Sequence, residues 1–256
     1  MPPPPPSPGA AAPEGPILAF ATSSDASRTA PPTENRPTPA AARASAKASQ
    51  TTRAGQTLVI ACGALAREIV DLIVALKLDR LAVTCLPAIW HNTPDKIPEG
   101  VRAKIRAARA QYDRILVAYG DCGTGGLLDR VLEEEGVARI DGPHCYQFYM
   151  GAADFSALTD AEPGCFFLTD YLARHFDRLI VEGLGLDRHP ELRDDYFGNY
   201  TKLVYLAQTD DAALEALARR AAETLKLKFE LRRTGYGELG DFIRAAGDGR
   251  TKEGAH

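Results

Sequence analysis

The sequence lacks an apolar run long enough to cross a membrane, and it lacks an excess of basic charge. A bilayer span needs roughly 18–20 consecutive apolar residues, and no stretch of the chain approaches that length. Lysine and arginine number 30 against 34 aspartates and glutamates, which gives a net charge of −4. Because neutralisation of phosphates by basic side chains dominates nucleic-acid affinity, this balance argues against a nucleic-acid partner.

Cysteine is also scarce, and its number is odd, at five in 256 residues. Secreted proteins that depend on disulfides carry even numbers of cysteines behind a signal peptide. The apolar run near the start, residues 17–21, is shorter than the roughly 7–15 residues of a signal-peptide core, and no basic segment precedes it. These features predict a cytoplasmic protein with free thiols.

The first 55 residues differ in composition from the remainder. They contain 12 of the 18 prolines, and alanine, serine and threonine fill most other positions. Such a stretch buries too little apolar surface to offset the roughly 1–2 kcal/mol per residue that ordering a backbone costs. We expect a disordered tail at 1–55, a single α/β domain at 56–246 with a net charge near −6, and a second disordered tail at 247–256.

Three strand–loop–helix units follow the first tail. Runs rich in β-branched residues at 57–61, 81–85 and 114–119 each precede a loop and a segment with helical spacing, and 138–141 is predicted as a short fourth strand. Consecutive parallel strands need such crossovers, and continuous apolar runs are typical of strands buried on both faces. The pattern predicts an open, mostly parallel Rossmann-like sheet with helices on both faces.

The second half of the chain is less regular. Its predicted strands and helices lie at 166–169, 171–182, 203–207, 212–225, 227–232 and near 239–245. The segment 212–225 has the clearest helical pattern, with leucines and alanines on one face. A second α/β half is compatible with this order of elements.

Thiols and imidazoles follow the predicted strands of the first half at the points where these strands end. Cys62 directly follows the first strand, Cys122 and Cys145 follow the third and fourth, and His91 and His144 lie in the loops after the second and fourth. Loops at the carboxyl ends of parallel strands gather at one edge, where ligands bind in open α/β sheets. We therefore expect these five side chains to share one edge of the sheet.

The five side chains suit zinc held by three thiolates and a histidine, or an iron–sulfur cluster with one iron open to a substrate. The separations of 60 and 23 residues between the thiols match no compact zinc finger. The prediction of a metal-binding protein or metalloenzyme therefore rests on the strand assignments. The alternative is that these thiols are small buried apolar groups, as we interpret Cys85 and Cys165.

The glycine-rich segment 120–126 supports two further hypotheses. Cys122 lies in a turn that opens a helix, where backbone amides and the helix dipole lower a thiol's pKa, so it could act as a metal-free nucleophile with Asp121 as acid or base. The turn could instead bind a small anion, or it could be a plain tight turn. The residues of that anion-binding hypothesis are Gly120, Gly123, Thr124, Gly125 and Gly126.

Nucleotide binding is not predicted for this segment. It lacks the Gly-Lys-Ser/Thr of a Walker A loop, and Leu128 stands where a dinucleotide fingerprint needs glycine. Further along the chain, His189 and Glu191 could bind a metal, although a solvated loop at 186–200 is the favoured interpretation. His175 lies within the predicted helix 171–182 and is interpreted as a surface residue.

Several of these segments also carry a resemblance to a known family. They are Ala61-Cys-Gly-Ala64, Leu86-Pro with His91-Asn, Tyr119-Gly-Asp-Cys-Gly-Thr-Gly-Gly126, Gly142-Pro-His-Cys145, Leu168-Thr-Asp170 and Pro190-Glu-Leu-Arg193 with Tyr196-Phe. With these motifs the chain resembles the uncharacterised domain of unknown function 1638 family. The resemblance covers residues from about 58 to 242 and excludes the first tail.

Genes of that family often lie near those for corrinoid-dependent methyltransferases, so the resemblance implies a link to methyl transfer from methylated amines. It implies a methyltransferase or a corrinoid protein as a partner, with this chain as a non-enzymatic accessory or a methyl-acceptor enzyme. The Asp-x-His-x-x-Gly loop of corrinoid carriers is incomplete here, because Leu192 follows Asp187 and His189 where glycine is needed. A corrinoid carrier is therefore not implied.

Overall fold

The structure is a computed structural model that describes residues 53–249. The predicted tails, 1–55 and 247–256, lie outside this range apart from their inner ends. There, residues 53–55 belong to the first strand and Gly247 ends the last helix. Within residues 53–249, no helix is long and apolar enough to cross a membrane.

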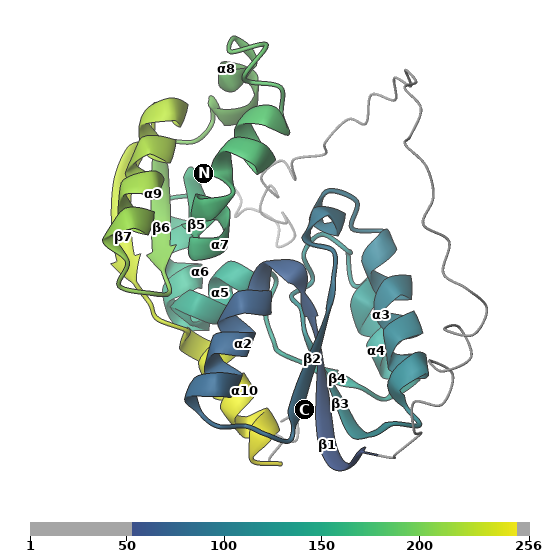
Figure 1. The fold of residues 1–256 in the computed structure, drawn as a ribbon. Helices are drawn as coiled ribbons and strands as arrows, with labels where there is room; N and C mark the ends of the chain where they lie inside the picture. Colours follow the sequence, from purple (N-terminus) through teal and green to yellow (C-terminus); the bar gives the residue numbers. More distant parts are fainter. Residues whose placement is uncertain (1–52, 250–256) are drawn as a thin grey trace, which may run out of the picture.

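The first sheet has four parallel strands in the order β2-β1-β3-β4 (Figure 1). They are β1 (Arg53–Cys62), β2 (Leu81–Leu86), β3 (Tyr112–Ala118) and β4 (Ala138–Arg139). Ile60 of β1 pairs with Thr84 of β2 and with Val117 of β3. Ile60 and Val117 are fully buried, as expected of strands covered on both faces. The parallel sheet predicted for the first half is confirmed.

Helices cover both faces of this sheet. α3 (Lys96–Ala108) and α4 (Leu127–Glu135) contact each other on one face, and α2 (Ala66–Ala75) lies on the other face with α10 (Gly237–Gly247) (Figure 1). In α3, Ile97, Val101 and Ile105 recur every fourth residue and form one buried face, which is why this segment packs as a helix. We call this sheet with α2, α3, α4 and α10 the first lobe.

The remaining strands form a second parallel sheet, which is the second α/β half that the order of elements allows. β5 (Cys165–Thr169), β6 (Lys202–Ala207) and β7 (Lys228–Arg233) are parallel in the order β5-β6-β7. The second lobe comprises this sheet, α7 (Asp170–Arg174), the π-helical turn η4 (Asp177–Glu182), α8 (Leu192–Phe197) and α9 (Ala212–Leu225). The helix predicted at 171–182 is thus divided between α7 and η4. The α/β class is confirmed.

Two short helices that were not predicted join the lobes. α5 (Cys145–Met150) and α6 (Ala152–Ala161) connect β4 to β5. Their residues Phe148, Phe155 and Leu158 pack in a core that also contains Phe167 of β5. From β7 the chain returns to the first lobe, where α10 contacts α2 and α5 (Figure 1). The chain therefore crosses between the lobes twice.

The strands of both sheets point their carboxyl ends toward the region between the lobes (Figure 1). The short turn after β1, η2 (Gly63–Leu65), contacts α7, which follows β5. Loops at the carboxyl ends of parallel strands carry the binding residues of α/β folds, so two such edges lie opposite one another here. We call the ends of β1, β3 and β5 with η2 and α7 the interlobe region.

Asp170 begins α7 and joins the end of β5 to the end of β6. Its side chain is fully buried. Its carboxylate accepts hydrogen bonds from the Tyr205 hydroxyl at 2.7 Å, the Gln208 N–H at 3.1 Å, and the N–H and hydroxyl of Thr209 at 3.0 and 2.6 Å. These donors compensate for the removal of the carboxylate from water.

Replacing Asp170 by alanine should lower the free energy of unfolding by about 3 kcal/mol or more, since each buried donor left without a partner costs roughly 1–3 kcal/mol. Urea unfolding followed by circular dichroism measures the change. The matched control is Asp187→Ala at an exposed position, which should change the free energy by less than about 0.5 kcal/mol. Equal stability of the two variants would show that the network around Asp170 contributes little.

Candidate functional site

The carboxyl edge of the first sheet carries Cys62, Cys122 and Cys145, and we call it the thiol edge. It lies where consecutive strands are placed on opposite sides of β1. The chain moves from β1 to β2 on one side and to β3 on the other, and ligands of open α/β sheets bind at the carboxyl ends of such strands. Cys62 ends β1, and Tyr119 directly follows β3. Gly63 permits a close turn here, because a Cβ at this position would lie 2.9 Å from the Leu86 carbonyl oxygen.

The loops that carry Cys122 and Cys145 are in direct backbone contact. The Cys122 N–H donates a hydrogen bond to the Pro143 carbonyl at 2.9 Å. Gly120 makes this approach possible, since a Cβ there would lie 3.0 Å from the same carbonyl oxygen. This contact explains why two cysteines that are distant in sequence lie near one another.

The structure brings Cys62, Cys122 and Cys145 within electrostatic reach of one another. Burial raises the pKa of all three thiols. Cys62 raises the pKa of Cys122 further, and both of these cysteines raise the pKa of Cys145. In the protein alone, the three groups are therefore neutral thiols near neutral pH.

The pKa of Cys122 shifts in the direction opposite to the predicted one. A lowered pKa was predicted from the start of a helix, but burial raises the pKa of Cys122 to about 12. The physical reason is that α4 begins only at Leu127, and that the thiol is buried beside Cys62. The backbone of Cys122 has a φ of 49°, a left-handed conformation that costs a non-glycine residue roughly 1–2 kcal/mol. Lys77 and Lys226 share this conformation where helices end, whereas Cys122 adopts it in a turn beside other thiols, where such strain can accompany function.

Tyr119 places a buried hydroxyl beside these thiols. Its side chain is 1% exposed, and its hydroxyl oxygen makes no hydrogen bond of normal geometry within residues 53–249. Burial raises the pKa of Tyr119, and Cys62 raises it further by its charge and by a side-chain hydrogen bond, which in turn lowers the pKa of the Cys62 thiol. This contact with the thiol falls outside normal hydrogen-bond geometry, and a thiol is a weak hydrogen-bond partner for the buried hydroxyl.

In the turn at 120–126, the Asp121 carboxylate occupies backbone amides that were predicted to bind an anion. Asp121 accepts hydrogen bonds from the Thr124 hydroxyl at 2.6 Å and from the N–H groups of Gly126 and Gly125 at 2.8 and 3.2 Å. Burial opposes ionisation, but these hydrogen bonds outweigh it and lower the pKa of Asp121. The Gly125 and Gly126 amides, which were predicted to bind a ligand, thus donate to Asp121. The Asp121 carboxylate is therefore not free to act as an acid or base.

The two histidines of the predicted metal site are neighbours. His91 lies in η3 (Ala88–Asn92), and His144 directly precedes α5. Burial lowers the pKa of His91, and His144 lowers it further, so the His91 imidazole is neutral near neutral pH. In the described part of the chain, no group of three or more His, Cys, Asp or Glu side chains is placed to hold a metal ion. The five predicted ligands share an edge without forming an assembled metal site.

The second lobe contributes residues that were not predicted as part of a site. Burial raises the pKa of Tyr171 in α7, Arg178 lowers it, and Cys62 raises it, so this tyrosine lies within electrostatic reach of the thiol edge. Its ring packs edge-on against His175 at a centroid distance of 4.8 Å. His175 is therefore half-buried and not simply a surface residue. The motif 168–170 could have identified this edge, because it ends a parallel strand as Cys62 does.

Glu68 in the first turn of α2 is a further site residue without a sequence signal. It is 3% exposed, and its Oε2 atom has no hydrogen-bond partner within residues 53–249. Burial raises the pKa of Glu68, and Arg174 of α7 opposes this effect from across the lobes. The distance between Arg174 Nη1 and Glu68 Oε1 is 4.0 Å, which is too long for a hydrogen bond.

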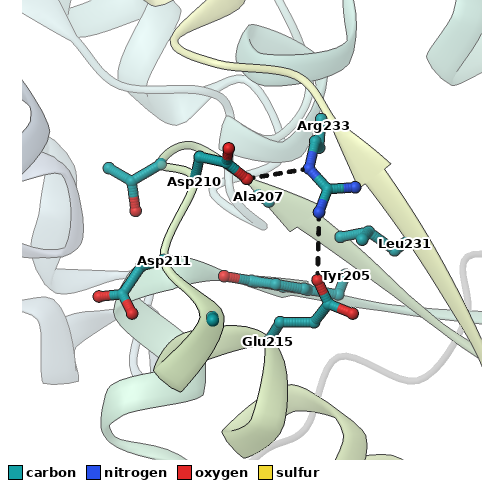
Figure 2. A pocket seen from close by; sticks show the side chains of 9 residues that line it. Tyr205, Ala207, Asp210, Asp211, Glu215, Leu231 and Arg233 are labelled. Carbon is teal, nitrogen blue, oxygen red and sulfur yellow. Dashed lines mark hydrogen bonds and ion pairs between the residues drawn. The ribbon is translucent and has the colours of Figure 1, made fainter.

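Two pockets lie beside the interlobe region. The first has a volume of about 200 Å³ at the carboxyl ends of β6 and β7 (Figure 2). In it, the Arg233 guanidinium contacts Asp210 at 3.1 Å and Glu215 at 3.2 Å, so its charge is already compensated. The second, of about 470 Å³, lies between α5 and the segment joining β7 to α10. Neither of these two pockets contains a residue of the predicted site.

Of the two cysteines interpreted as structural, Cys165 lies at the amino end of β5, whereas Cys85 of β2 lies near Cys62. Burial raises the pKa of Cys85, and Cys62 raises it further. All five cysteines are free thiols, as predicted. The His189 Nδ1 atom lies 3.2 Å from Glu191 Oε1, and both side chains are mostly exposed. This contact agrees with a solvated loop.

The fold and the site define a class of two-lobed α/β proteins with a thiol-bearing strand edge. The profile of a family described as "Protein of unknown function (DUF1638)" matches residues 85–243. The chain therefore belongs to this family, as its motifs indicated. The match includes Cys122, Cys145 and Arg174, and it begins after Cys62 and Glu68. No curated protein matches the chain.

Cys122 should react slowly with iodoacetamide at pH 7, because its raised pKa leaves almost no reactive thiolate. Below its pKa the thiolate fraction grows tenfold per pH unit, so the rate should rise by about 100-fold between pH 7 and pH 9. Mass spectrometry of the labelled peptide measures this rate against free cysteine. Labelling of Cys122 as fast as free cysteine at pH 7 would contradict the neutral-thiol state.

Proposed function

We propose that the protein binds a small molecule in the interlobe region and contacts it through the thiols of Cys62, Cys122 and Cys145. The observation that carries this proposal is a pair of buried polar atoms, Tyr119 Oη and Glu68 Oε2, that make no hydrogen bond of normal geometry among residues 53–249. Proteins rarely leave buried polar atoms unpaired, because each costs roughly 1–3 kcal/mol. A ligand that hydrogen-bonds to these atoms would remove that cost.

Cys145 lies within electrostatic reach of both Glu68 and the groups beside Tyr119. Its pKa responds to Cys122 and Cys62, which lie beside Tyr119, and also to Glu68. The strained backbone of Cys122 supports a functional role for its thiol, because glycine would fit the same conformation at lower cost. The position at the ends of β1 and β3 is the usual ligand position of open α/β sheets.

The chemistry of this site is that of neutral hydrogen-bond donors. Burial raises the pKa of the three thiols and of the Tyr119 hydroxyl, so all four groups carry their protons near neutral pH. They can donate hydrogen bonds to electronegative ligand atoms, or release protons when a cation enters. The first of these options needs no change in the side chains as they stand.

A low-molecular-weight filtrate of a cell extract should raise the unfolding temperature of the wild-type protein, because a ligand that binds only the folded state stabilises it. We expect the rise to persist in Cys165→Ser, whose thiol lies at the amino end of β5, and to be lost or strongly reduced in Cys122→Ser. Scanning fluorimetry measures the three proteins side by side. An unchanged wild-type temperature, or an equal rise in Cys122→Ser, would contradict the proposal.

A thiophilic metal ion or an iron–sulfur cluster is the second candidate for this site. It is favoured by three thiols from separate segments and by the neutral His91 imidazole, which are the donor types that zinc and iron–sulfur centres use. Binding would require the thiols to lose protons and to move, since the side chains are not placed to hold a metal ion within residues 53–249.

Anaerobic purification followed by elemental analysis distinguishes the metal candidate from the metal-free site. The metal candidate predicts stoichiometric zinc or iron in the wild-type protein and in Cys165→Ser, with loss in Cys122→Ser. A preparation with neither zinc nor iron removes the metal candidate and leaves the thiol site for a metal-free ligand. The methyltransferase or corrinoid partner implied by the family resemblance stays a separate prediction, which a pull-down tests.

A further inference from the structure

We infer that α7 and η4 supply the anion-binding half of the interlobe site through the guanidinium groups of Arg174 and Arg178, so that the bound small molecule carries a carboxylate or phosphate group. This inference rests on the proposed function for the position of the site, and it adds the chemical class of the ligand. The residues belong to the second lobe, opposite the thiol edge (Figure 1).

Arg174 is the central residue of this half-site. Its side chain is 22% exposed, and its guanidinium makes no hydrogen bond within residues 53–249. Within residues 53–249, the carboxylate oxygen in ion-pair range is on Glu68, 4.0 Å away. No Arg174 nitrogen is among the fully buried polar atoms that lack a partner, so its N–H donors reach the solvent between the lobes. A guanidinium has five N–H donors, and those of Arg174 are therefore available to an anionic ligand.

Arg178 of η4 is a second cation without a carboxylate partner in the described part of the chain. It lies near α7, because it lowers the pKa of both Tyr171 and His175. Arg178 is exposed, and Arg174 is in ion-pair range of Glu68 only among the described residues, whereas Arg233 contacts two carboxylates and Arg102 contacts Glu134 at 2.7 Å. The charges of Arg174 and Arg178 are therefore less compensated than those of Arg233 and Arg102.

The charges around these two arginines favour an anion. Burial lowers the pKa of His175, and Arg178 and Arg174 lower it further, which is the effect of a positive local field. The nearby Asp170 carboxylate is already fully hydrogen-bonded inside the second lobe. Burial raises the pKa of Glu68, so its neutral form, which can donate a hydrogen bond to an anion, is more accessible than in water.

The arrangement also defines the shape of the ligand. Arginine binds carboxylate and phosphate groups through parallel N–H donors, which fixes the orientation of the anionic end. Tyr171 reaches from the arginine side to within electrostatic range of Cys62. A ligand held at Arg174 by its anionic group would therefore extend toward Tyr119 and the thiols. The glycine turn at 120–126 cannot replace this role, because Asp121 occupies its Gly125 and Gly126 amides.

The test uses inorganic phosphate and acetate as probes at constant ionic strength set with chloride. We expect a saturable rise of the unfolding temperature with one of the two, and the responding probe identifies the anionic group. The half-saturating concentration should increase at least about ten-fold in Arg174→Gln, because a charge-assisted hydrogen bond is lost. Arg174→Lys should recover part of the affinity, since it keeps the charge without the planar fork.

The matched control is Arg188→Gln, which removes an arginine with a 73% exposed side chain near the start of α8 and should leave the half-saturating concentration unchanged. Saturation by neither probe, or an equal response of wild-type and Arg174→Gln proteins, overturns the inference. If the extract filtrate still stabilises Arg174→Gln but not Cys122→Ser, the inference fails and the proposed function stands. If a probe binds through Arg174 while the filtrate stabilises nothing, the proposed function fails and the anion site stands.

Discussion

Parallel strand pairing is the constraint on which the rest of this structure depends. Parallel strands need crossover connections, so the loops that follow them gather at the carboxyl edge of their sheet. Both sheets are built this way, and α5, α6 and α10 carry the chain between the lobes and back. As a consequence, the edge that carries the thiols faces the edge that carries Arg174. The site that we propose lies between these two edges and draws residues from both.

The buried polar groups of the two edges fall into two kinds. Asp170 and Asp121 accept hydrogen bonds from three or more donors each, and they hold their loops in place. Glu68 and Tyr119 are 3% and 1% exposed, yet each has a polar atom without a hydrogen bond of normal geometry among the described residues. Because unpaired burial lowers stability, this contrast is the reason for proposing a ligand at Glu68 and Tyr119.

Much of the first edge was predictable, because its signal is local. The apolar runs at 57–61 and 114–119 predict parallel strands, Cys62 directly follows the first run, and Cys122 lies three residues after the second. The sequence allowed a second α/β half without defining its sheet, because strand periodicity does not tell which strands pair. The pKa of Cys122 depends on burial beside Cys62, and the amides of the glycine turn depend on Asp121, so neither follows from sequence spacing. Arg174 and Glu68 meet only after the lobes assemble.

An experimental crystal structure of the protein purified under anaerobic conditions tests most directly whether the facing edges form a binding site. We expect non-protein density in the interlobe region, within hydrogen-bond distance of Glu68 Oε2 or Tyr119 Oη and in contact with Cys145 and Arg174. The contradicting result is a protein whose two edges pack against each other, with Glu68 Oε2 and Tyr119 Oη both hydrogen-bonded to protein groups and no space left between them.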